Sequence, residues 1–181
     1  MTDIFIHDSA NISPKSEIGK GTKIWINVQV RESAIVGENC IISKDVYIDH
    51  AVVIGNRCKI QNSVSIYNGV TIGDDVFVGP NVTFTNDKVP RAFNTNWRVT
   101  TTLIENGASL GANSTIVCGV IVGCYSMVAA GSVVTKNVPA HGMVLGNPAK
   151  LVGYVCECGS KLSENGLCKI CDKRFNLGGL K

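Results

Sequence analysis

The sequence has few aromatic side chains and almost no net charge. Aromatic residues make up only 6% of the 181 positions, whereas 45% are hydrophobic. A folded core must therefore consist mainly of small, branched side chains packed in ladders, with few stacked rings. The formal net charge is +3, from 17 basic and 14 acidic residues. A balance this small does not by itself indicate a nucleic-acid or membrane partner, and we expect neither.

The sequence also has no recognisable leader and no long apolar run. The first ten residues, MTDIFIHDSA, contain neither a basic segment nor an apolar segment of the kind found in a signal peptide. No stretch is long enough to span a membrane. We therefore expect a cytoplasmic protein in a reducing compartment, where its eight cysteines stay unpaired.

A period of six residues is the main positive signal. Isoleucine, leucine, valine or phenylalanine recurs at every sixth position from Ile6 to Phe84, and again from Ile104 to Val134. Four residues after each apolar position comes a small or β-branched residue. Neither an α-helix nor an ordinary sheet has this period, whereas each side of a parallel β-helix coil takes one hexapeptide. The sequence thus predicts an all-β fold, with a parallel β-helix domain over residues 1–150.

Glycines and one irregular interval mark the corners and a loop. In several hexads a glycine directly follows the apolar residue, and we interpret it as a corner residue with unusual backbone dihedral angles. These are Gly19, Gly37, Gly55, Gly73 and Gly79. The interval between Phe84 and Ile104 is not a multiple of six, so an excursion loop should occupy about residues 85–103. Loops of this length inside a compact repeat usually have a function.

Four of the cysteines belong to the hexads. Cys40 and Cys58 occupy the small inward position eighteen residues apart, which is one full coil. We expect them to stack in the core, because a free cysteine behaves as a small apolar side chain. Cys118 and Cys124 fall at equivalent turn positions, and their pattern indicates no function.

The other four cysteines predict a metal site in a second segment, residues 151–181. They form a CxC pair and a CxxC pair on two turns, at Cys156, Cys158, Cys168 and Cys171. Two pairs of thiolates on short turns are typical of a tetrahedral zinc ion. With four thiolates the site has no open position, so we predict a structural zinc ribbon. A disulfide-stapled tail is the alternative, and the missing leader disfavours it; an RNA-binding ribbon has little support, with five basic and three acidic residues.

Four segments give the chain a family resemblance. They are KIQNSVSIY (residues 59–67), GPNVTFTNDKVPRA (79–92), GASLGANSTIVCG (107–119) and GNPAK (146–150). Together with the hexads they resemble the left-handed β-helix acyltransferases. More narrowly, they are similar to the bacterial N-acetyltransferases of surface-polysaccharide (lipopolysaccharide) biosynthesis, which acetylate a 3-amino sugar linked to UDP or dTDP. The resemblance implies a left-handed coil, a homotrimer with active sites between neighbouring subunits, and acetyl-CoA along the C-terminal coils. It also implies direct attack of a neutral amine on the thioester.

The resemblance further implies roles for single residues. Asn86 is expected to orient the sugar amine, and the adjacent Asp87 to be one possible acceptor of its proton. The nucleotide-sugar surface is expected to include Gln61, Asn62, Ser65 and Tyr67, with Arg91 pairing with the pyrophosphate. The expected CoA contacts are Gly111, Ala129, Ala130, Lys136, Pro148 and Lys150.

Three alternatives stay open. A zinc enzyme of the carbonic anhydrase type needs three converging histidines, and the chain has only His7, His50 and His141. We expect each of these on the solvated surface, and His50 is the one to test as a general base. An acyltransferase with another acceptor, such as serine, maltose or chloramphenicol, would share the repeat. A non-catalytic scaffold with a zinc-ribbon docking module would explain the hexads and the cysteines, but not the loop.

Overall fold

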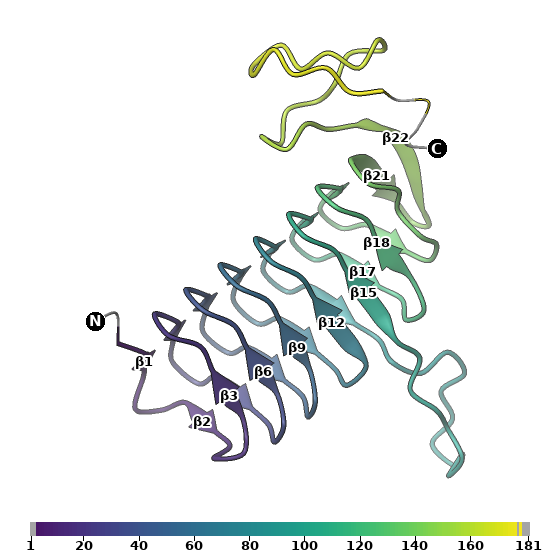
Figure 1. Ribbon diagram of the computed structural model, residues 1–181. Helices are drawn as coiled ribbons and strands as arrows, with labels where there is room; N and C mark the ends of the chain where they lie inside the picture. The colour runs from purple at the N-terminus through teal and green to yellow at the C-terminus, as the bar shows by residue number, and fades with distance from the viewer. Residues whose placement is uncertain (1–2, 177, 179–181) are drawn as a thin grey trace.

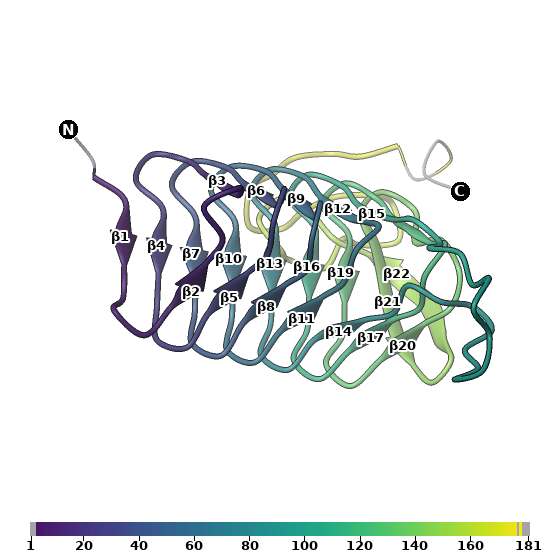
Figure 2. The same ribbon diagram turned by 90° about the horizontal axis from the view of Figure 1, so that it is seen from below.

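A computed structural model describes residues 3–176 and 178 of the chain. These residues contain no α-helix, and hence no helix that could cross a membrane. Short parallel strands follow one another around a three-sided coil, as the six-residue period predicts (Figures 1 and 2). The all-β, hexapeptide-repeat β-helix is thereby confirmed.

Each side of the coil is one sheet. The first sheet contains β1 (Phe5–Ile6), β4 (Lys23–Ile24), β7 (Ile41–Ile42), β10 (Lys59–Ile60), β13 (Phe77–Val78), β16 (Ser109–Leu110), β19 (Met127–Val128), β21 (Gly142–Gly146) and β22 (Ala149–Tyr154). The second contains β2 (Asn11–Ile12), β5 (Gln29–Val30), β8 (Tyr47–Ile48), β11 (Ser65–Ile66), β14 (Thr83–Phe84), β17 (Thr115–Ile116) and β20 (Val133–Val134). The third contains β3 (Glu17–Ile18), β6 (Ile35–Val36), β9 (Val53–Ile54), β12 (Val70–Ile72), β15 (Thr102–Ile104) and β18 (Ile121–Val122).

The register of the strands defines the coil. Lys23 pairs with Ile41, eighteen residues later, which is one hexad for each side. Phe77 pairs with Ser109, thirty-two residues later, because the excursion loop is inserted between them. The strands β14 and β15 bound this loop at residues 85–101, two residues fewer than expected. We call the corner between the first and second sheets the first edge, that between the second and third the second edge, and that between the third and first the third edge.

Both inward positions of each hexad fill the core. Ile24 and Val28 are 0% and 1% exposed, and the same positions stay buried as far as Val134. Cys40 and Cys58 are buried one above the other, as expected, and each thiol donates to the backbone of the next coil. The first coil is the exception: Ile6 is 42% exposed because no earlier coil covers it.

The corner glycines are required for a reason that the sequence analysis did not predict. The positive φ angles fall three residues after the apolar position, as at Asn27 (56°) and Arg57 (57°), and not at Gly19, Gly37 or Gly55. A Cβ atom on Gly37 would instead lie 2.6 Å from the carbonyl carbon of Gly55. The expectation of unusual dihedral angles at these glycines was therefore wrong. Glycine stacks on glycine at the third edge because the coils approach too closely there for a side chain.

The chain after β20 leaves the three-sided pattern. Strands β21 and β22 pair antiparallel and extend the first sheet. Residues 155–176 then form an irregular segment, the ribbon, which lies over the C-terminal end of the β-helix (Figure 1). It has a small core of its own, with Cys156, Leu162 and Cys168 buried and Phe175 packed against them. Residues 177 and 179–181 of the predicted C-terminal segment lie outside the described residues.

Candidate active site

The excursion loop leaves the β-helix at the second edge. Asn86 follows β14 at this corner, and the Thr100 N–H donates to its carbonyl oxygen at 2.8 Å, which closes the base of the loop. The residues at the same corner position in other coils are Glu32, His50, Asn68, Cys118 and Lys136. Successive coils are about 4.8 Å apart. His50 therefore lies two coils from Asn86, at a separation of about 10 Å.

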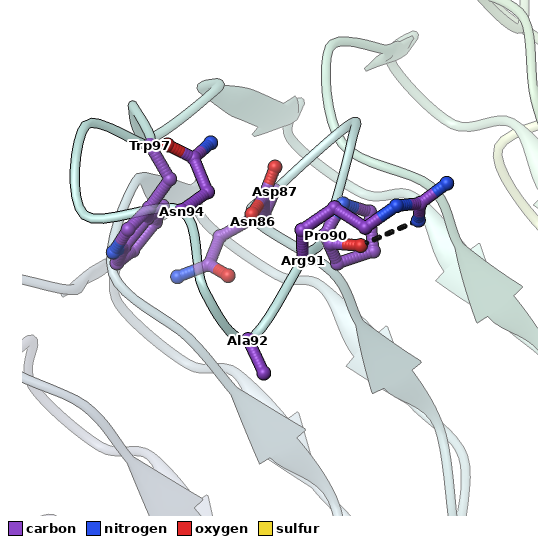
Figure 3. A pocket seen from close by; sticks show the side chains of 7 residues that line it. All are labelled: Asn86, Asp87, Pro90, Arg91, Ala92, Asn94 and Trp97. Carbon is purple, nitrogen blue, oxygen red and sulfur yellow. Dashed lines mark hydrogen bonds between the residues drawn. The ribbon is translucent and has the colours of Figure 1, made fainter.

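The loop curves around a hollow of about 470 Å³. Its lining consists of Asn86, Asp87, Pro90, Arg91, Ala92, Asn94 and Trp97 (Figure 3). Asp87 Oδ1 accepts the Val89 N–H at 2.8 Å, which stabilises the turn beside Asn86. The Arg91 guanidinium extends away from Asn86 and donates to the Pro90 carbonyl at 2.7 Å. Three residues of the predicted site, Asn86, Asp87 and Arg91, thus line one hollow.

Asp49, a carboxylate beside His50, was not predicted as a site residue from the sequence. The Asp49 side chain is only 10% exposed and accepts hydrogen bonds from Arg31 Nη1 at 3.0 Å and the Tyr47 hydroxyl at 2.9 Å. Backbone N–H groups of His50 and Asn68 donate to it at 2.8 and 3.2 Å. Burial alone would raise the pKa of Asp49, but the N–H groups of His50 and Asn68, the Tyr47 hydroxyl and the His50 side chain outweigh it and lower the pKa overall.

Asp49 also orients the imidazole of His50. Its Oδ1 lies 3.3 Å from His50 Nδ1, while almost half of the His50 side chain stays exposed. Asp49 lies one coil after Arg31, at the same corner position. The eighteen-residue spacing between Arg31 and Asp49, with His50 next to Asp49, was the signal in the sequence from which this cluster could have been predicted.

The first edge carries a second hollow, near the C-terminal coils. It measures about 340 Å³, and its lining consists of Phe77, Ser109, Leu110, Gly111, Met127, Val128, Ala129 and Ala130. A Cβ atom on Gly111 would lie 2.5 Å from the Ala130 nitrogen, so the two backbones are in close contact. The structure thus brings together Gly111, Ala129 and Ala130, the small residues expected to contact CoA.

The other expected CoA contacts lie elsewhere. Lys136, Pro148 and Lys150 line a separate hollow of about 400 Å³, between the segment after β20 and the β21–β22 hairpin. The predicted CoA residues are therefore divided between two hollows at the C-terminal end of the molecule.

The expected nucleotide-sugar residues are also divided. Gln61 and Asn62 follow β10 at the first edge, whereas Tyr67 follows β11 at the second edge, with its ring 5.8 Å from that of Tyr47. Ser65 lies between them in β11, paired with Tyr47 and with Thr83 in the neighbouring strands. One side of the coil, about 20 Å of extended chain, separates Gln61 from Tyr67. Within a single chain, these residues do not form one cluster.

The ribbon brings its four cysteines together. The sulfur atoms of Cys156, Cys158, Cys168 and Cys171 all lie within 4.8 Å of one another. Those of Cys158 and Cys168 are 3.7 Å apart, close to the distance of about 3.8 Å that a tetrahedral ion with zinc–sulfur bonds of about 2.3 Å requires. The hydroxyl and N–H of Ser160 lower the pKa of Cys158 to about 6, whereas the neighbouring Cys158 raises the pKa of Cys171 to about 12. The donor set and its spacing therefore fit zinc.

The three histidines are far apart. His7 bonds Ser9 at the first edge, His50 lies at the second edge, and His141 follows the last coil. In the described part of the chain, the cysteines are the only group of three or more potential ligands close enough to hold a metal ion. A three-histidine zinc centre therefore has no support within one chain.

His141 is not the solvated side chain that we expected. Its ring stacks on Tyr125 at 5.5 Å and packs against Phe175 of the ribbon at 4.8 Å. Its Nδ1 lies 3.0 Å from the Val155 carbonyl oxygen, and its own carbonyl accepts the Val155 N–H at 2.7 Å. His141 thus links the ribbon to the β-helix.

Two family models match the chain. Residues 1–92, just over half of it, match the model described as GMPPB C-terminal domain, and residues 102–136 match the hexapeptide repeat of succinyl-transferase.

Two curated relatives match shorter parts. The dTDP-3-amino-3,6-dideoxy-alpha-D-galactopyranose 3-N-acetyltransferase of Aneurinibacillus thermoaerophilus is 51% identical over 77 residues, which are 41% of this chain and 40% of that relative. Serine acetyltransferase 4 of Arabidopsis thaliana is 57% identical over 54 residues, 30% of this chain and 15% of that relative. The matches therefore span less than half of either relative.

Solved structures share the fold. A hexapeptide-repeat acetyltransferase of Vibrio cholerae, complexed with acetyl coenzyme A, is 27% identical and has a TM-score of 0.53, covering 62% of this chain and 69% of its own. PerB from Caulobacter crescentus, in complex with CoA and GDP-perosamine, is 23% identical with a TM-score of 0.54. The match covers 83% of this chain and 57% of PerB. The second likeness shows the fold alone.

Proposed function

This chain belongs to the hexapeptide-repeat β-helix acetyltransferases, with residues 1–92 in the GMPPB C-terminal domain family, and we propose that it N-acetylates a nucleotide-linked amino sugar. The acceptor is the 3-amino group of a sugar carried by UDP or dTDP, and the donor is acetyl-CoA. The observation that carries this proposal is the 51% identity, over 77 residues, to an enzyme named for 3-N-acetylation of a dTDP-linked amino sugar. The hollow around Asn86 supports it, because it offers polar groups beside an open surface.

In the proposed reaction the neutral amine attacks the carbonyl carbon of the thioester. A C–N bond forms, the C–S bond breaks, and the amine loses one proton. The side-chain oxygen of Asn86 accepts an N–H of the amine and so aims its lone pair, but a carboxamide is too weak a base to take the proton. The proton passes to the departing thiolate, directly or through water or Asp87. Positioning of two bound reactants supplies much of the rate.

The division of the site between two edges supports a homotrimer. The loop hollow lies at the second edge and the small-residue hollow at the first, so one chain holds Asn86 far from Gly111 and Ala130. In a threefold assembly, the first edge of one subunit can face the second edge of the next, which completes three equivalent sites. The outer face of the third sheet also carries exposed Ile35, Val53 and Ile121, an apolar column suited to a subunit contact.

In this arrangement the residues near the C-terminal end have distinct roles. The backbone around Gly111 and Ala130 lets the pantetheine arm approach closely, and Lys136 and Lys150 meet phosphates of CoA. We assign a structural zinc ion to the four cysteines of the ribbon. With no open position, this ion would hold the ribbon together and take no part in acetyl transfer.

The test of the reaction is mass spectrometry of small molecules. The purified protein is incubated with acetyl-CoA and a panel of UDP- and dTDP-linked 3-amino and 4-amino sugars, and the products are identified by mass. A gain of one acetyl group on a 3-amino sugar is the expected result. If acetyl-CoA binds but no member of the panel is acetylated, the acceptor is wrong. If acetyl-CoA does not bind either, the scaffold alternative replaces the proposal.

The shared site is tested by mixing two inactive variants. Asn86→Ala removes the second-edge function, and Ala130→Trp fills the first-edge hollow. When the two are co-expressed, random trimers contain intact sites wherever an unmodified first edge meets an unmodified second edge, so about a quarter of wild-type turnover should return. If each site lay within one chain, every site would carry one of the two changes and no activity would return.

A further inference from the structure

A fourth hollow lies on the first edge, toward the N-terminal end of the molecule. It measures about 290 Å³, and its lining consists of Trp25, Ile26, Ser43, Lys44 and Asn62. Only Asn62 had an expected role. Trp25 is 44% exposed and Ile26 is 41% exposed, although both are large apolar side chains. The reaction proposed above does not explain why an indole should be exposed beside polar groups at this place.

We propose that this hollow binds the uracil or thymine base of the nucleotide-linked acceptor, with Trp25 as the stacking surface. The inference rests on the proposed function and adds the position of the nucleoside end. The Phe5 ring packs against Trp25 at 5.3 Å with an interplanar angle of 57°, which helps to hold the indole in place. Stacking on an aromatic ring tolerates either base, and the polar side chains of Ser43 and Asn62 can bond a pyrimidine edge.

The cation of the hollow suits a phosphate. Lys44 Nζ lies 3.1 Å from Asp45 Oδ2, and both side chains are well exposed. Lys44, and then Asn27, lower the pKa of Asp45 by hydrogen bonding, so the carboxylate stays ionised. An exposed ion pair contributes little free energy. Lys44 can therefore turn from Asp45 toward the diphosphate at small cost.

The position of the hollow along the edge agrees with the shape of the acceptor. Trp25, Ser43, Gln61, Gly79 and Gly111 occupy the same corner position in successive coils. At about 4.8 Å for each coil, Trp25 lies about 14 Å from Gly79 and about 19 Å from Gly111. An extended nucleotide sugar laid along this edge would have its base at Trp25, its diphosphate near Gln61, and its amino sugar next to the small-residue hollow where the thioester is expected.

Binding of the free nucleotides tests the inference directly. Trp25 and Trp97 are the only tryptophans of the chain, so the Trp97→Phe variant reports on Trp25 alone. We expect dTDP or UDP to quench its fluorescence in a saturable way, and to have no comparable effect on the matched Trp25→Phe variant. Equal quenching in both variants, or quenching only of Trp97, would overturn the assignment.

Affinity gives the second measurement. In the 181-residue chain, Trp25→Ala should weaken dTDP or UDP binding roughly 10- to 100-fold, as loss of one stacked base does. It should raise the KM for the nucleotide sugar and leave the KM for acetyl-CoA unchanged. An unchanged nucleotide affinity would refute the inference, as would dissociation of the oligomer, which would make Trp25 a subunit contact.

The two proposals can fail separately. Acetylation of a nucleotide sugar with normal KM by the Trp25→Ala variant would refute the base position and leave the proposed function intact. Nucleotide quenching of Trp25, without acetylation of any sugar in the panel, would retain the binding site and refute the reaction.

Discussion

Single residues at the second edge differ in how firmly the fold holds them. Asp49 is nearly buried and accepts hydrogen bonds from two side chains and two backbone N–H groups. Asn86 stands at the base of a solvent-facing loop, where its backbone is held by Thr100 and its side chain lines an open hollow. We therefore expect replacement of Asp49 to affect stability, and replacement of Asn86 to affect turnover.

For Asn86→Ala we expect kcat to fall on the order of 100-fold, because loss of one orienting contact misplaces the amine. The dissociation constant of acetyl-CoA should stay the same, since Asn86 lines neither of the two hollows that hold the expected CoA contacts. Steady-state kinetics and calorimetric titration measure the two quantities. Asn96→Ala is the matched control, because Asn96 is exposed on the same loop but does not line the hollow. Equal activity in the Asn86 variant would exclude Asn86 from the site.

For His50→Ala we expect turnover to stay nearly intact, because direct attack needs no general base. Asp49 does contact Nδ1 of the His50 imidazole, so general-base catalysis by His50 is the competing expectation. The pH profile of kcat/KM separates direct attack from general-base catalysis by His50. A large fall in rate, together with a changed pH profile, would make His50 the base.

For Asp49→Asn we expect a loss of about 2 kcal/mol of unfolding free energy at pH 7, the value typical of hydrogen bonds to a charged group. The native pKa of Asp49 is lowered, so the ionised group stabilises the fold above the unfolded pKa of about 3.9, and this contribution disappears as pH falls through the native value. Denaturant unfolding from pH 7 down to pH 3 should therefore be flatter in the variant. Parallel curves would show that Asp49 does not carry this dependence.

Among the elements, the ribbon is attached to the rest of the molecule through few residues. Beyond the β21–β22 hairpin, it meets the last coil through His141, between Tyr125 of the β-helix and Phe175 of the ribbon. Two aromatic contacts of this kind contribute about 1 to 3 kcal/mol together. The orientation of the ribbon therefore depends on these rings and on the two contacts between His141 and Val155, while the β-helix depends on its whole ladder of strands.

Phe175→Ala should release the ribbon without unfolding the β-helix. We expect faster proteolytic cleavage after about residue 154, with little change in the main thermal transition. Ile170→Ala is the control, because Ile170 is 74% exposed on the same ribbon. A cleavage rate equal to that of the wild-type protein would mean that the His141 contacts do not hold the ribbon.

At the scale of the whole molecule, the two ends of the β-helix are finished differently. The first coil leaves Phe5 and Ile6 partly exposed, whereas the hairpin and the ribbon lie over the last coil (Figure 1). A repeat fold needs capping elements because a terminal coil otherwise exposes its apolar face. We infer that the ribbon, held together by the proposed zinc ion, is the cap of the C-terminal end.

Replacing both Cys156 and Cys171 by serine should then lower the melting temperature and promote association through the uncovered end. Elemental analysis should find about one zinc ion for each wild-type chain and none in the variant. Cys124→Ser, outside the ribbon, is the control and should keep both the metal and the melting temperature. An unchanged melting temperature and a clean trimer in the double variant would count against the capping role.

The hexad period by itself determined the β-helix, its core and the place of the loop. Each coil contacts only its neighbours, so the same pattern of inward apolar residues repeats every eighteen residues. The spacing of Cys156, Cys158, Cys168 and Cys171 likewise predicted a cluster that the fold forms. The resemblance to the acetyltransferase family supplied the expected roles of Asn86 and Arg91, which remain predictions.

Only the tertiary structure decided what lies around the corners. Asp49 contacts Arg31 because their coils stack, and the stacked glycines are close for the same reason. The packing of His141 between two rings, and the separation of Gln61 from Asn86, depend on which edge each residue occupies. Inward positions are specified by hydrophobic burial, which a sequence pattern displays. Outward positions can hold any polar residue, so their partners are set by the stacking of the coils and not by the local sequence.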